Sequence, residues 1–218
     1  MSISSEYLKL FVNATEKAAY GASKFIGKGD KIAADKGAVD PLRSELNKIN
    51  MHGTVVIGEG EMDEAPMLYI GEKLGTLNGP KFDIAVDPLE GTKFTAYNQP
   101  NAFSVLVVAE KGNLLSAPDT YMEKIAIGSN LPNNLLDLDN GVDKNIRLLA
   151  EAKNKKPSDL KACVLKRSRH DHIIKSLIDL DVKINFITDG DIAGALTVIG
   201  KNPLNDIYYS TGGGPEGV

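Results

Sequence analysis

The chain has 218 residues, with 25 Lys and Arg against 29 Asp and Glu, a net charge of −4 and a hydrophobic content of 42%. Its single cysteine, Cys163, excludes an internal disulfide and a zinc site built of several thiolates, and we expect it in the core. No stretch suits a membrane span, no signal peptide is visible, and no basic block suits nucleic acid. These observations predict a cytoplasmic protein with no membrane or nucleic-acid partner.

The first half of the sequence mixes helical and strand periodicity. Helices are predicted over 5–26, over the residues that follow Asp35, and over 66–75. Short apolar runs predict strands over 54–58, 82–88 and 104–111. Gly112 is then expected to lead into a hairpin.

Beyond the turn-rich region 128–143 the elements alternate regularly. Helices are predicted over 143–154, 170–180 and 191–199, and strands over 161–165, 182–187 and 206–210. This alternation favours a mostly parallel sheet covered by helices. We therefore expect an α/β chain with an α+β subdomain over 1–135, an α/β subdomain over 136–218, and two α/β layers rather than one uniform doubly wound sheet.

Four acidic residues follow the predicted strand 54–58: Glu59, Glu61, Asp63 and Glu64. Asp63 and Glu64 also suit the start of a helix, where acidic side chains cap or neutralise the first turn. That alternative does not explain Glu59, which stands at the end of an apolar strand.

A second acidic pair occurs in the segment DPLEGT, where Pro88 is expected to bend the chain so that the carboxylates of Asp87 and Glu90 converge. Two carboxylates 4 Å apart repel by ~4 kcal/mol at an effective dielectric of 20, and a divalent cation removes that repulsion. Hard oxygen ligands favour Mg²⁺ or Mn²⁺ over zinc. A plain turn at a strand end is the alternative for this segment taken alone.

Several segments closely resemble the class II (GlpX-type) fructose-1,6-bisphosphatases. They are IGEGEMDEAPMLYIGEKLGT (57–76), FDIAVDPLEGT (82–92), APDTYMEK (117–124), RHD (169–171), DGD (189–191) and GGGPEGV (212–218). DPLEGT is also similar to the metal-binding signature of the lithium-sensitive phosphatases. The resemblance implies an α/β fold, a layered α-β-α-β-α sandwich of the sugar phosphatase type. Family members continue well beyond PEGV, so we expect the C-terminal part to be missing here.

The resemblance also implies the residues of the site. It implies Mn²⁺ or Mg²⁺ ligation by Asp35, Glu59, Asp87, Glu90 and Glu216, and catalytic roles for Asp63, Thr92 and Lys31. It implies substrate binding by Glu90, Gly91, Thr92, Tyr121, Arg167, Ser168, Arg169, Asp189, Gly190, Asp191 and Gly213. From the residues alone, Asp35 and Asp191 suit helix N-caps, and Tyr121 suits ordinary packing.

A basic segment follows the predicted strand 161–165, at the end where α/β sheets place ligands. Arg167 and Arg169 suit phosphate oxygens, although a basic surface turn is the alternative. Family members resemble this segment with Lys-Pro-Arg, so Arg167 keeps the charge but changes its geometry. The glycines of 212–214, expected as a turn before a helix, suit an anion through their backbone N–H groups.

The resemblance implies metal-dependent hydrolysis of fructose 1,6-bisphosphate to fructose 6-phosphate and phosphate by metal-activated water, in gluconeogenesis or glycerol metabolism. Two alternatives remain. One is a dual fructose-1,6-/sedoheptulose-1,7-bisphosphatase, and the other is a non-catalytic fragment that binds sugar phosphates. We expect the subdomain over 1–135 to bind metal, the subdomain over 136–218 to bind the sugar bisphosphate, and the chain to form a homo-oligomer, a dimer or tetramer.

Overall fold

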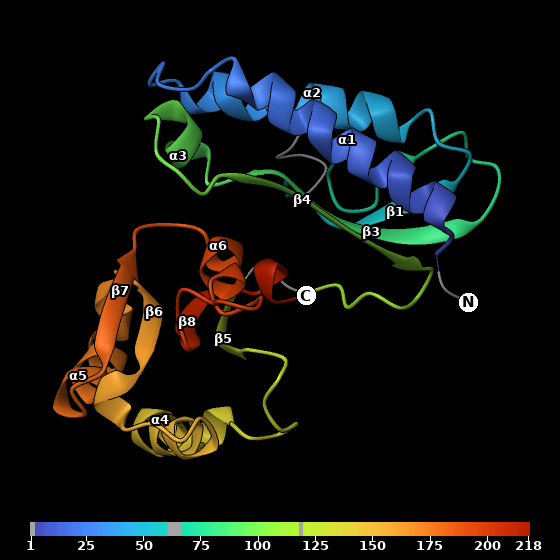
Figure 1. The fold of residues 1–218 in the computed structure, drawn as a ribbon. Coiled ribbons are helices and arrows are strands. Elements are labelled where there is room, and N and C mark those ends of the chain that lie inside the picture. The colour runs from blue at the N-terminus through green and yellow to red at the C-terminus, as the bar shows by residue number, and fades with distance from the viewer. Residues whose placement is uncertain (1–2, 61–66, 118–119) are drawn as a thin grey trace. The chain divides into compact units, whose positions relative to one another are not determined.

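The computed structural model describes residues 3–60, 67–117 and 120–218. It divides into two compact units, Met1–Pro118 with Val218 and Asp119–Gly217, and each unit has its own β-sheet (Figure 1). The α/β class is confirmed, and the strands form two separate sheets rather than one uniform doubly wound sheet. The division falls earlier than the expected boundary after residue 135, because strand β5 (Tyr121–Ile127) pairs within the sheet of the second unit.

The first unit is a mixed sheet covered on one face by two long helices (Figure 1). Its described elements are α1 (Ser5–Ser23), α2 (Lys31–Leu46), β1 (His52–Ile57), β2 (Lys73–Leu74), β3 (Lys81–Glu90), α3 (Thr92–Ala96) and β4 (Phe103–Glu110). The strand order is β2-β1-β3-β4, in which β1 and β3 are parallel and the two outer pairs are antiparallel. Leu42, Leu46 and Ile84 are fully buried between the helices and the sheet.

Helix α2 begins earlier than predicted. The carboxylate of Asp30 accepts a hydrogen bond from the Ala33 N–H at 2.9 Å and caps the helix. Asp35 therefore lies inside the first turns of α2, and its reading as an N-cap is wrong. This position leaves the Asp35 carboxylate available for other interactions.

The predicted helix over 66–75 is wrong for its described residues, which form turns and the short strand β2. Glu72 explains this path. Its side chain is 3% exposed, pairs with Arg43 of α2 at 2.6 Å, and accepts a hydrogen bond from the Leu68 N–H. A buried carboxylate held by a distant arginine thus fixes a backbone that local periodicity assigns to a helix.

Two further local predictions are wrong. The hairpin expected at Gly112 does not form, because β4 pairs with β3 and the next described strand, β5, belongs to the other sheet. Pro88 does not turn the chain away from the sheet. Strand β3 continues to Glu90, with an irregularity in its pairing with β4 between Asp87 and Glu90.

The second unit has three layers, with helices on both faces of a mostly parallel sheet (Figure 1). Its elements are β5, η1 (Leu138–Asn140), α4 (Gly141–Ala152), η2 (Pro157–Asp159), β6 (Lys161–Leu165), η3 (Ser168–His170), α5 (Asp171–Asp179), β7 (Lys183–Ile187), α6 (Asp191–Leu196), β8 (Ile207–Gly213) and η4 (Pro215–Gly217). The strand order is β5-β8-β6-β7. Strand β6 is parallel to β7 and β8, and β5 is an antiparallel edge strand.

Successive residues of the central strands face opposite layers, as the period of a strand requires. Ala162 and Val164 of β6 pack with the layer of α4 and α5, whereas Cys163 packs with Val198 and Tyr208 beside α6. Cys163 is fully buried and free, which confirms it as a core residue, and burial raises its pKa to about 11. No described helix has the length and apolar character needed to cross a membrane.

Helices α1 and α2 pack most closely at Gly21. A Cβ atom at this position would collide with the backbone oxygen of Gly37 and approach the ring of Pro41. Although alanine is favoured over glycine within a helix by about 1 kcal/mol, we expect Gly21→Ala to destabilise the chain by about 1–3 kcal/mol through overpacking. Chemical denaturation measures this loss.

The matched control is Gly37→Ala, the same substitution on the facing helix. Its Cβ would meet mainly the ring of Phe25, a side chain that is able to move, so its loss should be smaller. Equal losses for the two variants, or none for Gly21→Ala, would contradict this account of the helix packing.

Candidate active site in two parts

Two of the predicted metal ligands, Glu59 and Asp87, are brought toward one edge of the first sheet by parallel strand pairing. Strands β1 and β3 pair in parallel with Ile57 opposite Ala85. Glu59 and Asp87 each follow two residues later, so the parallel register carries both toward the same edge of the sheet. Their joint ligation of a metal ion stays a prediction.

Asp35 approaches the same edge from α2 and interacts with Glu59. Burial, together with the negative charge of Asp35, raises the pKa of Glu59 to about 7. Burial also raises the pKa of Asp35. Glu59 as a whole residue is exposed, so water screens part of the repulsion between the two carboxylates. Two acids with raised pKa values, neither paired with a cationic side chain among the described residues, favour a divalent cation.

The segment DPLEGT follows a different path from the predicted bend. The Leu89 N–H donates to the carboxylate of Asp87 at 3.0 Å, and Glu90 is 6% exposed. Gly91 has a φ of +79° and immediately precedes α3, so Thr92 is the first residue of that helix. The segment thus combines the end of a buried strand with the start of a short helix.

Lys31 and Thr92 lie on two elements that are joined through the loop before α2. The N–H groups of Gly27 and Gly29 donate to the backbone oxygens of Thr95 and Ala96 in α3, at 3.0 and 2.8 Å. Lys31 begins α2 one turn before Asp35 and is exposed. This arrangement agrees with the predicted membership of Lys31 and Thr92 in one site.

The donor set of the first unit fits a hard divalent cation in its chemistry, since it consists of carboxylate oxygens. Within residues 3–60, 67–117 and 120–218, no three His, Cys, Asp or Glu side chains are already close enough to form a cluster that could hold a metal ion. Asp63 lies outside the described residues. Glu216 belongs to the second unit, so its ligation of the same ion stays a prediction.

The second unit gathers the remaining predicted substrate-binding residues, those from Tyr121 to Gly213, around the carboxyl ends of β6, β7 and β8. The guanidinium of Arg169 lies 4.6 Å from the ring centroid of Tyr121, the first residue of β5, and its Nε donates to the Thr211 backbone oxygen at 2.8 Å. Tyr121 pairs with Gly213 across the sheet. The Arg169 guanidinium is thereby held on one face by the Tyr121 ring and at Nε by Thr211. Its other N–H groups remain as donors for an anion.

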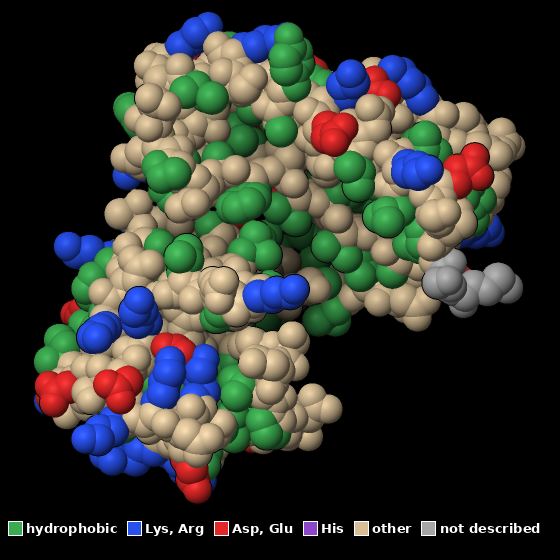
Figure 2. Space-filling model, viewed as in Figure 1, with side chains coloured by type: hydrophobic (Ala, Val, Ile, Leu, Met, Phe, Trp, Pro, Cys, Tyr) green, Lys and Arg blue, Asp and Glu red, His purple; other side chains and the backbone are tan. Residues whose placement is uncertain are grey.

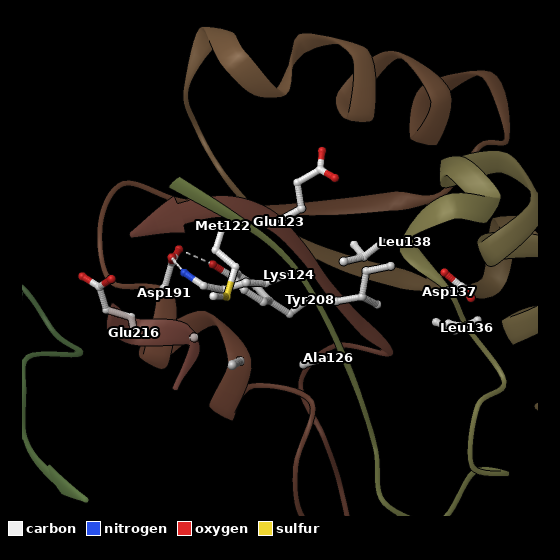
Figure 3. Close-up of a pocket in the computed structure, with 13 residues that line it drawn as sticks. Met122, Glu123, Lys124, Ala126, Leu136, Asp137, Leu138, Asp191, Tyr208 and Glu216 are labelled. Carbon is white, nitrogen blue, oxygen red and sulfur yellow. Dashed lines mark hydrogen bonds and ion pairs between the residues drawn. The ribbon is translucent and has the colours of Figure 1, made fainter. Parts of the chain in front are cut away.

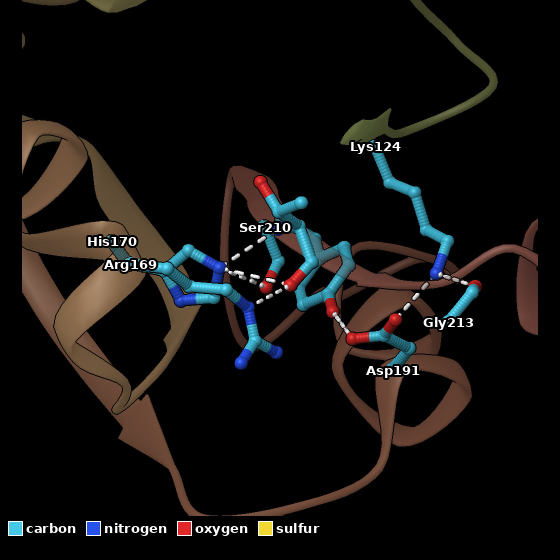
Figure 4. Close-up of polar contacts among 8 residues, drawn as sticks. Lys124, Arg169, His170, Asp191, Ser210 and Gly213 are labelled. Carbon is cyan, nitrogen blue, oxygen red and sulfur yellow. Dashed lines mark hydrogen bonds and ion pairs between the residues drawn. The ribbon is translucent and has the colours of Figure 1, made fainter. Parts of the chain in front are cut away.

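His170, the neighbour of Arg169, links two strands of the sheet by hydrogen bonds inside the protein. It is fully buried, its Nδ1 lies 2.7 Å from the Leu165 backbone oxygen, and its Nε2 accepts from the Thr211 N–H at 2.9 Å (Figure 4). These bonds join the end of β6 to the end of β8. His170 is therefore a structural residue that positions its neighbour Arg169.

Arg167 and Asp189 form a partly exposed ion pair at 3.7 Å, which links the segments that follow β6 and β7. Ser168 is exposed beside this pair, and Gly190 immediately precedes α6. A pair this long and exposed contributes little stability, because water screens it and both side chains are costly to immobilise. Arg167 and Asp189 are therefore able to give up this ion pair and bind a ligand instead.

Asp191 is the most enclosed of the predicted substrate-binding residues in the second unit, and its reading as an N-cap is wrong. It is the first residue of α6 and makes no capping bond. Its carboxylate accepts from the Tyr208 hydroxyl at 2.5 Å and pairs with Lys124 Nζ at 2.5 Å, while Lys124 also donates to the Gly213 oxygen at 2.5 Å (Figure 4). Lys124 and Tyr208 were not among the predicted site residues, and only the three-dimensional contact reveals them.

The expected glycine turn at 212–214 is wrong, because Gly212 and Gly213 belong to strand β8 and pair with β5. The Gly214 N–H donates to the Thr120 oxygen and is not available to an anion. A Cβ on Gly212 would collide with the carboxylate of Asp191, and one on Gly213 with that of Glu216. These glycines therefore make room for two acidic side chains.

A cavity of about 530 Å³ opens beside these groups. Figure 3 shows Lys124, Asp191 and Glu216 at one end of the cavity and Leu136 and Leu138 at the other. Its volume is that of a small-molecule site. The second unit thus combines a cavity with the cationic side chains of Arg167 and Arg169.

The raised pKa of Glu59 predicts a pH-dependent stability of the metal-free chain. Because the folded state holds the Glu59 proton up to about pH 7 instead of the ordinary 4.5, its contribution to stability is present below pH 4.5 and is lost as the pH rises through 7. In EDTA, Glu59→Gln should therefore raise the melting temperature at pH 8 and leave it nearly unchanged at pH 4.5. Calorimetry at the two pH values tests this.

The matched control is Glu16→Gln, which removes an exposed carboxylate from α1. Its effect on the melting temperature should be the same at the two pH values. With Mn²⁺ present at pH 8, the parent chain should melt at a higher temperature than Glu59→Gln, since the cation stabilises only the chain that keeps the carboxylate. A Glu59→Gln variant that melts below the parent at pH 8 in EDTA would be incompatible with the assigned repulsion.

The ion pair of Lys124 with Asp191 predicts a large stability effect. The two side chains are 12% and 5% exposed, so Lys124→Met leaves a buried carboxylate without its cation. We expect a loss of about 3 kcal/mol in the free energy of unfolding, measured by urea denaturation. Lys144→Met, on the exposed surface of α4, should cost far less. Replacing both partners in Lys124→Met/Asp191→Leu should recover part of the loss, and a larger loss in the double variant would refute the pairing argument.

Comparison with known proteins agrees with this geometry. The family described as bacterial fructose-1,6-bisphosphatase, glpX-encoded, matches residues 6–218. Fructose-1,6-bisphosphatase 1 class 2 of Escherichia coli (strain K12) and the class 2 enzyme of Haemophilus influenzae are each 47% identical over 208 residues, which cover 95% of this chain and 62% of the relative. D-fructose 1,6-bisphosphatase class 2/sedoheptulose 1,7-bisphosphatase of Thermosynechococcus vestitus is 39% identical over 219 residues, which cover 95% of this chain and 63% of the relative. The chain spans about three fifths of the length of these curated relatives. By this match over nearly its whole length, the chain belongs to the glpX-encoded bacterial fructose-1,6-bisphosphatase family.

Proposed function

We propose that this chain carries out the metal-dependent hydrolysis of fructose 1,6-bisphosphate to fructose 6-phosphate and phosphate. The observation that carries the proposal is the mutual repulsion of Asp35 and Glu59 at the edge where Asp87 follows the neighbouring strand. Such carboxylates favour a divalent cation, and relatives 47% identical to the chain are named fructose-1,6-bisphosphatases. Family membership and site chemistry thus support the same reaction.

The proposed ligands of Mn²⁺ or Mg²⁺ are Asp35, Glu59, Asp87, Glu90 and Glu216. When bound, such an ion supplies charge neutralisation and lowers the pKa of a water. Thr92 and Asp63 would orient and deprotonate the attacking water, and Lys31 would add a positive charge near the phosphate. Phosphoryl transfer requires mainly positioning and electrostatic stabilisation, which these side chains provide.

The second phosphate would bind in the second unit, at the segment that carries Arg167 and Arg169. Arg169 is already oriented by the ring of Tyr121 and by Thr211, and Arg167 and Ser168 lie on the same segment. Glu90, Gly91 and Thr92 would contact the reacting end of the substrate. The sugar hydroxyls would meet the segment Asp189–Asp191 and the backbone at Gly213.

A second candidate is a dual activity on fructose 1,6-bisphosphate and sedoheptulose 1,7-bisphosphate. The name of the Thermosynechococcus vestitus relative, 39% identical to this chain, favours it. The two substrates share the same phosphorylated ends, so the carboxylate and arginine sets suit both. A non-catalytic sugar-phosphate-binding fragment is the third possibility, and only turnover separates it from the first two.

We also propose the setting of the reaction. A cytoplasmic homo-oligomer, a dimer or tetramer, would serve gluconeogenesis or glycerol metabolism. The support is the family of the chain together with the finding that no described helix could cross a membrane. Size-exclusion chromatography with light scattering measures the oligomeric state.

The function is tested by phosphate release from fructose 1,6-bisphosphate with Mn²⁺ and then with excess EDTA. We expect release that depends on Mn²⁺, and its loss by at least about 100-fold in Glu59→Ala and in Asp87→Ala, because each removes a proposed metal ligand. Sedoheptulose 1,7-bisphosphate in the same assay distinguishes the single from the dual activity.

Glu16→Ala serves as the control, since it removes an exposed carboxylate from α1 outside the site. It should retain full turnover. Circular dichroism confirms that each variant is folded. Full activity in Glu59→Ala would disprove the proposed metal site, and absence of release by the folded parent chain with Mn²⁺ would favour the non-catalytic alternative.

A further inference from the structure

A second cavity of the Asp119–Gly217 unit lies at the opposite edge of its sheet from the predicted substrate-binding residues. It has a volume of about 430 Å³ and is formed by four segments. These are the residues after β5 and α4, the start of β6, and the loop between α6 and β8. Strand β6 separates the two edges by about 16 Å, at about 3.3 Å a residue. We call this cavity the amino-edge pocket.

The lining of the amino-edge pocket is strongly basic. It contains Lys153, Lys155, Lys161 and Lys201, against Asp159 and Asp206. Figure 2 shows Lys and Arg side chains gathered on the part of the second unit near α4. Four ammonium groups and two carboxylates leave an excess of two positive charges, in a chain whose overall charge is negative.

Asp206 organises this lining from within. It is 7% exposed, its Oδ2 accepts from the Lys161 N–H at 2.8 Å, and its Oδ1 pairs with Lys153 at 2.5 Å and Lys155 at 3.1 Å. Burial alone would raise the pKa of Asp206, but these contacts outweigh burial and lower it. One buried carboxylate therefore holds two ammonium groups beside the cavity.

The other two lysines have no such partner. Neither Lys161 nor Lys201 forms an ion pair with any residue that the structure describes. Both are exposed, and both line the cavity. The positive charge that Asp206 does not compensate is thus concentrated in the lining of one cavity. This arrangement differs from lysines that are spread over an open face.

We propose that the amino-edge pocket binds a small phosphate-bearing anion. A phosphate monoester carries close to two negative charges at neutral pH and three acceptor oxygens, which matches the excess charge of the lining. Lysine ammonium groups bind phosphate as point charges. The volume suits a phosphorylated metabolite and also admits inorganic phosphate. This site is independent of the proposed catalytic reaction, because none of its lining residues belongs to the predicted active site.

The test is an NMR titration of the metal-free, ¹⁵N-labelled chain with inorganic phosphate and, separately, with glucose 6-phosphate. We expect saturable shifts of the Gly200 and Lys201 amides, which report on the pocket itself. In Lys161→Gln/Lys201→Gln the half-saturating concentration should rise by about tenfold or more, since two cationic partners of the anion are lost. Because neither side chain is ion-paired within the described structure, the variant should remain folded, and its spectrum verifies this.

The matched control is Lys9→Gln/Lys175→Gln, which removes the same charge from exposed positions on α1 and α5. It should bind as the parent does. Tighter binding of glucose 6-phosphate would identify a phosphorylated metabolite as the ligand, and tighter binding of inorganic phosphate would identify free phosphate. The proposal is overturned by shifts that do not saturate, that appear equally with KCl at matched ionic strength, or that persist unchanged in Lys161→Gln/Lys201→Gln.

Discussion

Parallel strand pairing is the constraint on which the candidate site residues of each unit depend. In the first unit, β1 beside β3 carries Glu59 and Asp87 to one edge of the sheet. In the second, β6 lies parallel to β7 and β8, so the segments that follow β6 and β7 meet the last residues of β8. Parallel strands end on the same side, so residues far apart in sequence meet without any direct attraction between them. Side-chain contacts such as that of Arg169 with Tyr121 then refine a position that the backbone has already set.

The sequence predicts the second unit better than the first, for a physical reason. The strand expected over 161–165 coincides with β6, because a short apolar run between a helix and a turn leaves few alternatives. The segment 67–75 fails because its path depends on Glu72, a buried carboxylate paired with Arg43 on another element. Local periodicity carries no information about a partner 29 positions away. Predictions from pattern therefore hold where packing alone decides the backbone, and fail where a buried charge does.

The candidate site shows the same limit. A carboxylate that follows a strand, such as Glu59 after β1, is visible in sequence, because an apolar run marks where that strand stops. The roles of Lys124 and Tyr208 are not, since each looks like an ordinary strand residue until the fold places it on Asp191. Gly212 is also misleading, because a glycine run suggests a turn or an anion site. Here its missing side chain accommodates the carboxylate of Asp191 inside the sheet.

The compensation of acidic side chains differs between the two units. In the second unit, Asp191 is neutralised by Lys124, Asp206 by Lys153 and Lys155, and Asp189 lies beside Arg167. In the first, Asp35 and Glu59 have raised pKa values and face no cationic side chain among the described residues. Acids that the protein neutralises itself have little affinity to spare for a metal ion, whereas acids held together without compensation gain from one. The repulsion left between Asp35 and Glu59 is therefore energy that a bound divalent cation would recover, whereas Arg169 of the second unit, which has donors left, would suit the phosphate of the proposed function.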